Sequence, residues 1–284
     1  MKNAMQLKAL IKNIAKEKGV AAQAIMQNYM LERLLERISV SDYQDKFILK
    51  GGMLIAAMVG LDSRTTMDMD ATLRGMPLTE ESARNALSRI LALDLSDGIS
   101  FELKSIAPIR EDDVYGGYRA SITAVFDTIR TALKIDLTTG DKITPKEISY
   151  QFALMFEDRS INVLAYNLET VLAEKYETIL RRSVMNTRMR DFYDVYILMN
   201  FQSKNIDGSV LKKAVETTAA ARESSAVLSD TDTVLKLLAD DEAMQSAWAL
   251  YQRDFSYAKD IAWSDIIRAV RSVGELLSQE SKED

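Results

Sequence analysis

The chain has 284 residues, of which 47% are hydrophobic and 27% charged, a composition typical of a globular protein with one large domain or two smaller ones. It has no cysteine and no histidine, which excludes a disulfide framework, a thiolate or imidazole zinc site and a Ser-His-Asp triad. With 36 Lys and Arg against 42 Asp and Glu, the net charge is −6, so binding to a nucleic acid requires a local basic surface.

The first 40 residues predict two amphipathic helices. Apolar residues recur at helical spacing from Met5 to Ile14 and again from Ile25 to Ile38, with a break at Gly19. No stretch approaches the ~20 apolar residues that a membrane span needs. We therefore expect a cytoplasmic protein without membrane contact, and we expect a monomer.

Between residues 47 and 137, strand-like and helix-like patterns alternate. An apolar run over 47–49 leads into a glycine pair, and residues 53–59 predict a short buried helix. Residues 67–73 alternate Met and Asp, as a half-exposed strand does. A helix over 79–93, with Thr79 as its N-cap, precedes three predicted strands, namely Phe101 to Ile106, Tyr118 to Phe126 and Thr131 to Leu137.

From about residue 166 the strand signal disappears and helical spacing continues to the end of the chain. We expect an α+β protein with two domains, in which residues 1–165 hold the N-terminal helices and an α/β domain. Residues 166–284 form a helical domain. Its predicted helices cover 168–182, 191–199, 210–220, 232–238, 241–251 and 264–277.

The segment around residues 49–74 carries most of the chemical information. Gly51 and Gly52 can present backbone N–H groups to an anion at the start of a helix. Asp68 and Asp70, one residue apart on a predicted strand, point to the same side and can hold a divalent metal. Because the chain offers only hard oxygen ligands, that metal would be Mg²⁺ or Mn²⁺.

A third carboxylate comes from the strand over 131–137. Lys134 and Asp136 share one face of that strand, and its apolar residues share the other. Together with Asp68 and Asp70, Asp136 could bracket two metals about 3.5–4 Å apart, an arrangement that serves phosphoryl and nucleotidyl transfer. The alternative is that these polar residues only form the solvent face of their strands.

Four motifs resemble the AbiEii/AbiGii family of nucleotidyltransferase toxins. They are GGMLIAAMVGLDSRTTMDMD at residues 51–70, KID at 134–136, EKYETILRR at 174–182 and RDFYDVY at 190–196. They occur in the order that the family has, and the helical start and end of the chain also resemble it. The resemblance implies a DNA-polymerase-β-like nucleotidyltransferase core with a small mixed sheet, flanked by the N-terminal helices and the helical domain.

The resemblance also implies a function. Members of the family are toxins of two-gene toxin–antitoxin systems linked to abortive phage infection, so this protein is expected to transfer a nucleotide from an NTP. Related toxins suggest an RNA acceptor, the tRNA 3′ end, and a separately encoded antitoxin that need not form a stable complex. The motif places Gly51 and Gly52 at the triphosphate and Asp68 and Asp70 on the metals. Where the broader superfamily commonly has Gly-Ser, this chain has Gly51-Gly52, so a serine hydroxyl is missing.

Arg64, Thr65 and Thr66 precede the metal strand, where a guanidinium and two hydroxyls could bind the nucleotide phosphates. They could equally be ordinary surface-loop residues. Asp136, in the second motif, could ligate a metal or accept the proton of an acceptor hydroxyl, because no histidine is available for that role.

Lys175 lies on the apolar stripe of its predicted helix rather than on the solvent side. It could snorkel outward at a domain edge, but the family motif favours a catalytic ammonium that faces a cleft between the domains and binds NTP phosphates. Asp191 and Asp194 lie one turn apart and should face the lysine helix, with Asp191 as a catalytic and Asp194 as a supporting residue. Helix capping is the alternative for both aspartates.

Four arginines without an intervening acid separate the last two motifs: Arg181, Arg182, Arg188 and Arg190. This cluster could bind the triphosphate through Arg182 or an RNA backbone, with Arg190 in support, or it could be solvated charge on a helix end.

Two further functions remain open, namely a catalytically silent NTP-binding or interaction module and a nucleotidyltransferase that acts on small molecules.

Overall fold

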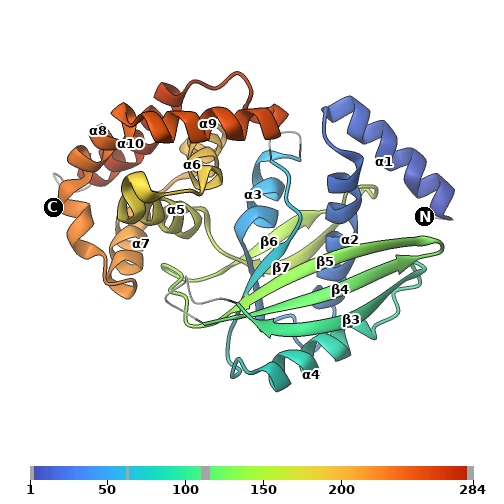
Figure 1. Ribbon diagram of the computed structural model, residues 1–284. Helices are drawn as coiled ribbons and strands as arrows, with labels where there is room; N and C mark the ends of the chain where they lie inside the picture. Colours follow the sequence, from blue (N-terminus) through green and yellow to red (C-terminus); the bar gives the residue numbers. More distant parts are fainter. Residues whose placement is uncertain (1–2, 62–63, 110–115, 280–284) are drawn as a thin grey trace. The chain divides into compact units, whose positions relative to one another are not determined.

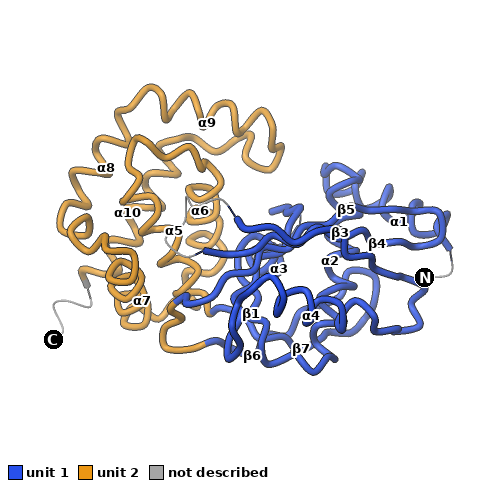
Figure 2. Tube along the Cα trace, turned by 60° about the horizontal axis from the view of Figure 1, so that its bottom comes forward, with its two compact units in different colours: residues 1–141, 147–166 blue, residues 142–146, 167–284 orange. Residues whose placement is uncertain are grey.

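The computed structural model describes residues 3–61, 64–109 and 116–279 (Figure 1). The chain divides into two compact units, coloured separately in Figure 2. Unit 1 comprises residues 1–141 and 147–166, and unit 2 comprises residues 142–146 and 167–284. Each unit has its own packed interior.

Unit 1 is built on one seven-stranded sheet with strand order β3-β4-β5-β2-β1-β7-β6. Strand β1 pairs parallel with β7 and antiparallel with β2, and β2 pairs parallel with β5, so the sheet is mixed. The predicted α+β class is confirmed. The strands are β1 (Phe47–Lys50), β2 (Met69–Leu73), β3 (Ile99–Pro108), β4 (Tyr118–Phe126), β5 (Ile129–Thr138), β6 (Ile148–Ala153) and β7 (Ser160–Ala165).

Helices α2 and α4 bury one face of this sheet, and α1 packs against α2. Helix α2 packs against β5 and β7, α4 packs against β3, and α2 also contacts α4, so the two helices lie on the same face. Strand β5 alternates buried and exposed residues along its length, which leaves the opposite face of β3, β4 and β5 open to solvent. The helices are α1 (Ala4–Lys18), α2 (Ala22–Ser39), α3 (Gly51–Val59) and α4 (Glu80–Leu91).

The sheet is larger than the sequence predicted, because β6 and β7 were not anticipated. They form an antiparallel pair in which Phe152 lies opposite Ile161. Strand β6 has the sequence ISYQFA and is mostly exposed, and Phe152 is its one buried residue, so burial does not mark it as a core strand. Its position follows from pairing with β7, which in turn joins the sheet through β1.

An ionic cluster anchors α2 to the segment that follows β6. Glu32 is buried and accepts a hydrogen bond from the backbone N–H of Met155 at 2.7 Å. Arg33, also buried, contacts Glu32 at 2.5 Å and Glu157 at 2.5 Å. Burial raises the pKa of Glu32 to about 7, although the neighbouring Arg33 acts in the opposite direction.

Unit 2 is helical, as the sequence predicted. Within it, α5 packs against α6 and α7, and α10 packs against α6, α7 and α8. Its interior contains stacked rings, with Tyr193, Trp248 and Tyr251 in mutual contact, and the indole of Trp248 donates to the carbonyl of Ile261 at 2.9 Å. The helices are α5 (Leu168–Arg182), α6 (Met189–Gln202), α7 (Gly208–Ala221), α8 (Thr231–Asp240), α9 (Glu242–Asp254) and α10 (Trp263–Gln279).

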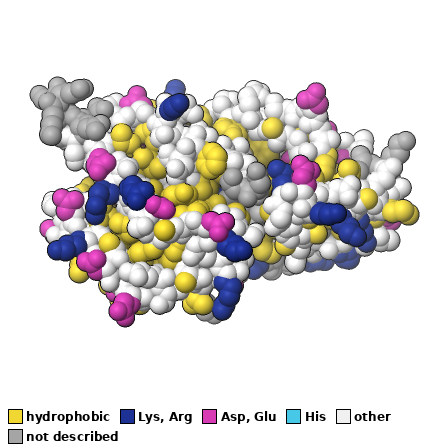
Figure 3. Space-filling model, turned by 90° about the horizontal axis from the view of Figure 1, so that it is seen from above, with side chains coloured by type: hydrophobic (Ala, Val, Ile, Leu, Met, Phe, Trp, Pro, Cys, Tyr) yellow, Lys and Arg dark blue, Asp and Glu magenta, His cyan; other side chains and the backbone are white. Residues whose placement is uncertain are grey.

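Acidic and basic side chains are interspersed on the face of unit 2 that Figure 3 shows in its left half, with hydrophobic side chains between them. On this face the charges therefore form no extended field of one sign. None of the helices in the described part of the chain combines the length and the apolar character that a membrane span requires.

The raised pKa of Glu32 makes the stability of the protein depend on pH. The folded state holds this proton more tightly than the unfolded chain, so the stability that the proton contributes is lost as pH rises from about 4.5 through about 7. Because the chain has no histidine and no cysteine, few other groups titrate in that range. We expect the free energy of unfolding to fall by about 1–3 kcal/mol between pH 5 and pH 8.

Urea unfolding at a series of pH values measures this slope. Glu32→Gln keeps the acceptor for Met155 and should remove most of the slope. Glu157→Gln is the matched control, because Glu157 contacts the same arginine but has a lowered pKa. A slope that persists in the Glu32 variant would show that another group titrates.

Candidate active site

The site in unit 1 begins at the turn between β1 and α3. Gly51 opens α3 with φ +65°, a conformation that L side chains rarely adopt. A Cβ atom at this position would overlap the Oδ2 atom of Asp70, so the carboxylate of Asp70 lies directly against the Gly51 backbone. Lys50, the N-cap of α3, makes no side-chain cap hydrogen bond. The turn therefore places the electropositive start of a helix beside the carboxylate of Asp70.

The second glycine brings two more predicted residues to the first turn of α3. A Cβ on Gly52 would lie 2.9 Å from Thr66 Oγ1 and 3.0 Å from Arg64 Nη2. Arg64 is 2% exposed and Thr66 is 1% exposed, and Thr65 is also buried, so the surface-loop alternative is wrong for all three. Arg64 donates to the carbonyl of Thr65, and Asn28 donates to the carbonyl of Thr66 at 2.7 Å.

Asp68 does not lie on the strand that the sequence predicted for it. Strand β2 begins at Met69, one residue later. The hydroxyl of Thr66 lies 2.9 Å from Asp68 Oδ1 and 3.1 Å from the Asp68 carbonyl oxygen, and these contacts hold the chain in a bend before the strand starts. The side chain of Asp68 is thus positioned by a local turn rather than by the alternation of a strand.

Asp70 and Asp136 are register partners on the neighbouring parallel strands β2 and β5. Adjacent strands lie about 4.8 Å apart, so the two side chains leave the same face of the sheet within reach of one cation. Asp136 is 15% exposed. The sequence predicted the shared face, but it could not predict the pairing between residues 66 positions apart.

Arg119 is a residue of this site that the sequence analysis missed. It lies on β4 as the register partner of Asp136. Its Nε and Nη2 atoms donate to the two oxygens of Asp136, each at 2.6 Å. The hydrogen bond to Asp136 raises the pKa of Arg119, and the charges of Asp136, Asp68 and Asp70 act in the same direction. Arg119 is therefore the guanidinium that balances these three carboxylates.

A second missed group surrounds Asp141. Lys50 contacts Asp141 at 2.8 Å, and the hydroxyls of Thr72 and Thr138 each donate to the same carboxylate at 2.6 Å. Although burial favours the neutral acid, the Lys50 ammonium and the hydroxyl donors hold the pKa of Asp141 below its ordinary value. This network ties β1, β2 and β5 together beside Asp70, and each residue is ordinary when read alone in the sequence.

The side chains around Asp70 have the chemistry that Mg²⁺ requires. The three carboxylates supply hard anionic oxygens, and neither a thiolate nor an imidazole is present to favour a softer ion. Among the described residues, no three acidic side chains already lie in an arrangement that could hold a metal ion. Asp136 is engaged with Arg119 and Asp68 with Thr66, so the donor set fits a divalent ion once these side chains turn toward it.

The other predicted residues belong to unit 2, where Lys175 joins Asp191 and Asp194. Lys175 Nζ lies 2.6 Å from Asp191 Oδ1 and 3.4 Å from Asp194 Oδ2, which confirms that both aspartates face the lysine helix. Asp194 is 0% exposed. The N-cap of α6 is Arg188, so neither aspartate is the N-cap residue, and Asp191 lies in the first turn of the helix.

The arginines of the cluster make different contacts. Arg181 pairs with Glu177 at 2.8 Å, and the guanidinium of Arg190 lies over the ring of Phe255, 5.2 Å from its centroid. Arg182 has a buried Nε atom without a hydrogen-bond partner in the part of the chain that the structure describes. The four arginines therefore do not form one uniform basic surface.

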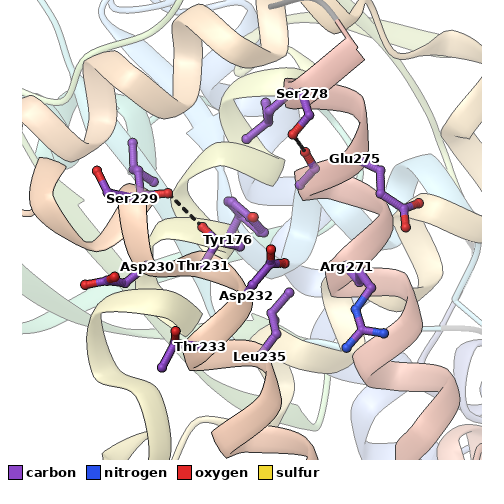
Figure 4. A pocket seen from close by; sticks show the side chains of 13 residues that line it. Tyr176, Ser229, Asp230, Thr231, Asp232, Thr233, Leu235, Arg271, Glu275 and Ser278 are labelled. Atoms are coloured by element: carbon purple, nitrogen blue, oxygen red, sulfur yellow. Dashed lines mark hydrogen bonds between the residues drawn. The ribbon is translucent and has the colours of Figure 1, made fainter.

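Unit 2 also contains an open pocket of about 580 Å³ that includes none of the predicted residues (Figure 4). It lies between the start of α8 and the end of α10, and the hydroxyl of Tyr176 points into it from α5. Burial raises the pKa of Tyr176 to about 12, so this phenol stays protonated at neutral pH. Acidic and basic side chains line the pocket together: Asp230, Asp232, Arg271 and Glu275.

Two solved structures share the fold. A crystal structure of JHP933 from Helicobacter pylori matches with a TM-score of 0.55 and 15% identity, and it covers 93% of this chain and 97% of its own. A crystal structure of a candidate nucleotidyltransferase from H. pylori matches with a TM-score of 0.52 and 14% identity, over 92% of this chain and 99% of its own. At this identity they establish the nucleotidyltransferase-like fold alone. No curated protein matches the chain by sequence.

The family comparison is more specific. The model of the family described as "Nucleotidyl transferase AbiEii toxin, Type IV TA system" matches residues 33–270, which include both groups of residues described above. The predicted polymerase-β-like core agrees with this match and with the fold of the two neighbours. The protein belongs to the AbiEii family of nucleotidyl transferase toxins of type IV toxin–antitoxin systems.

Proposed function

We propose that the protein is a Mg²⁺-dependent nucleotidyltransferase toxin that transfers an NMP group from an NTP to RNA, with the tRNA 3′ end as acceptor. The observation that carries this proposal is the packing of the start of α3 against Asp70, whose register partner is Asp136. A helix start and paired carboxylates at one place can bind a triphosphate and its metal together. The RNA acceptor is supported only by the resemblance to related toxins.

Each residue of unit 1 has a role in this proposal. The backbone of Gly51 and Gly52, with Arg64 and Thr66 beside it, binds the triphosphate, and Thr65 supports Arg64 through its carbonyl. Asp68, Asp70 and Asp136 would hold the metal. A bound divalent ion would neutralise phosphate charge and lower the pKa of the attacking hydroxyl.

The proposed reaction is a displacement at the α-phosphate of the NTP. A 3′-hydroxyl oxygen of the acceptor forms a bond to the α-phosphorus, the bond between the α-phosphorus and the bridging oxygen breaks, and pyrophosphate leaves. The hydroxyl proton goes to Asp136 or to solvent. With no histidine in the chain, few other groups could accept it.

For unit 2, we propose that Lys175 binds NTP phosphates and that Asp191 sets its position through the 2.6 Å contact. Asp194, fully buried beneath the same ammonium, supports this arrangement. Arg182 and Arg190 would assist in binding the polyanion. We further propose a cytoplasmic monomer whose antitoxin is encoded separately and does not need a stable complex with the toxin.

Replacement of the metal ligands tests the reaction. Loss of an outer-shell partner at a metal site costs about 10–100-fold in activity, so Asp68→Asn and Asp70→Asn should each cost more than about 100-fold. Purified variants are incubated with labelled NTPs, Mg²⁺ and total RNA, and label on RNA is counted. Asp45→Asn, an exposed acid of the same unit, is the control and should remain active. Transfer that survives the double variant would contradict the assigned ligands.

The same experiment separates the two alternatives. A silent NTP-binding module would leave the double Asp68 and Asp70 variant as toxic in cells as the parent. A small-molecule nucleotidyltransferase would place the label on a metabolite and none on RNA. Sequencing of cellular RNA 3′ ends after brief expression would identify the acceptor.

Gly51→Ala tests the contact between the helix start and Asp70. A non-glycine residue at positive φ costs about 1–2 kcal/mol, and here the new methyl group would also displace the Asp70 carboxylate. Gly19→Ala is a matched control, because Gly19 has the same φ of +65° with nothing within 4 Å of an added Cβ. We expect both variants to lose thermal stability, Gly51→Ala more because of the overlap with Asp70, and we expect only Gly51→Ala to lose nucleotidyl transfer. Equal activity in the two would show that the contact is not required.

Lys175→Met tests the ion triad of unit 2. Removing the ammonium takes from two buried carboxylates the positive charge that they share, which we expect to cost about 3 kcal/mol of stability. Adding Asp191→Asn should restore part of that stability and none of the transfer activity. Urea unfolding measures the change in stability, and the KM for NTP measures the loss of phosphate binding. A double variant that regains activity would show that Lys175 only neutralises the aspartates.

A further inference from the structure

The Arg119–Asp136 pair has the geometry of a strong interaction. Two parallel hydrogen bonds of 2.6 Å join the guanidinium to both carboxylate oxygens. Bidentate pairs of this kind are among the stronger charge-assisted contacts in proteins. Asp136 is 15% exposed and Arg119 is 43% exposed, so the acid is sheltered while the base keeps access to solvent. The carboxylate is therefore held in place by a side chain that is itself partly exposed to solvent.

The pair lies where a divalent ion would act. Asp136 is the register partner of Asp70 on one side and of Arg119 on the other, so Arg119 reaches the carboxylates from the adjacent strand β4. The charges of Asp68 and Asp70 also act on this guanidinium. A divalent cation bound to the same carboxylates would therefore meet a positive group at close range, and the two cations would repel each other.

An NTP supplies an anionic partner for the Arg119 guanidinium, which a bare metal ion cannot do. Its triphosphate offers anionic oxygens in the geometry that a guanidinium binds through two hydrogen bonds. If Arg119 turns from Asp136 to a phosphate, Asp136 becomes available and the guanidinium keeps an anionic partner. The open face of β4 and β5 leaves room for this rotation, because residues on that face of β5 are exposed or half-buried.

We propose that Arg119 competes with the divalent cation for Asp136, and that the NTP relieves the competition by giving the guanidinium a phosphate partner. This inference rests on the proposed function. It makes Arg119 a substrate-binding residue and couples metal binding to nucleotide binding, since each ligand binds more readily once the other has displaced the pair. The metal alone would bind weakly, and the metal–NTP complex would bind tightly.

Arg119→Gln should change the two affinities in opposite directions. Mn²⁺ binding to the full chain is measured from the EPR signal of the free ion, and binding of a labelled, non-hydrolysable NTP analogue is measured by equilibrium dialysis at saturating Mn²⁺. We expect Mn²⁺ alone to bind about 3- to 10-fold more tightly to the variant, and the analogue to bind about 10-fold more weakly.

Arg130→Gln is the matched control. Arg130 lies on the same face in β5 and pairs with Glu102 at 2.9 Å, away from the three aspartates. Both affinities should be unchanged in this variant. Arg119→Lys keeps the charge without the bidentate geometry and should fall between the parent and Arg119→Gln for both ligands.

The outcomes separate this inference from the function on which it rests. Mn²⁺ affinity that is unchanged or weaker in Arg119→Gln, while Asp70→Asn abolishes Mn²⁺ binding, would overturn the competition and leave the metal role of Asp70 intact. Mn²⁺ binding that Asp70→Asn does not affect would overturn the proposed metal site itself. Both tests read binding, so neither depends on identifying the acceptor.

Discussion

The contact between Gly51 and Asp70 is the constraint on which the site of unit 1 depends. The left-handed backbone of Gly51 turns the chain from β1 directly into α3, and the missing Cβ lets the carboxylate lie against the start of the helix. Asp70 is fixed in turn by its pairing with Lys50 and Asp136 in the sheet. Any side chain at position 51 would separate the helix start from the carboxylate, and phosphate and metal chemistry could then no longer act at one place.

Charge balance explains the residues around this contact. Three carboxylates from β2, β5 and the preceding bend would repel one another without a nearby cation. Arg119 supplies that charge from β4, while Lys50 is used separately to neutralise the buried Asp141. Unit 2 has a similar balance, because one ammonium, that of Lys175, contacts two aspartates. Proposed catalytic residues of both units, Asp136 and Lys175, are therefore also partners in ion pairs, so substitutions must separate lost chemistry from lost charge balance.

The sequence predicted the elements whose pattern is local. Helix α5 was predicted with the bounds that it has, and β4 likewise, because 15 and 9 residues of regular burial leave a clear period. It missed β6 and β7, six-residue strands in which the alternation of polar and apolar residues is short. It also began the β2 strand at Met67, two residues early, because the alternation of Met and Asp continues past the point where pairing stops. The bend at Asp68 depends on the hydroxyl of Thr66, a contact that the alternation does not reveal.

The sequence by itself determined the types of chemistry and the candidate residues. Without histidine or cysteine only carboxylates, lysine and hydroxyls are available, and the spacing of the motifs places them on particular elements. Only the tertiary structure decided which charges meet. The pairing of Asp136 with Arg119, the burial of Arg64 and Thr66 against Gly52, and the Lys50–Asp141 network join segments far apart in the chain. Sheet register sets these partners, and register depends on the packing of whole strands, which no local pattern of residues encodes.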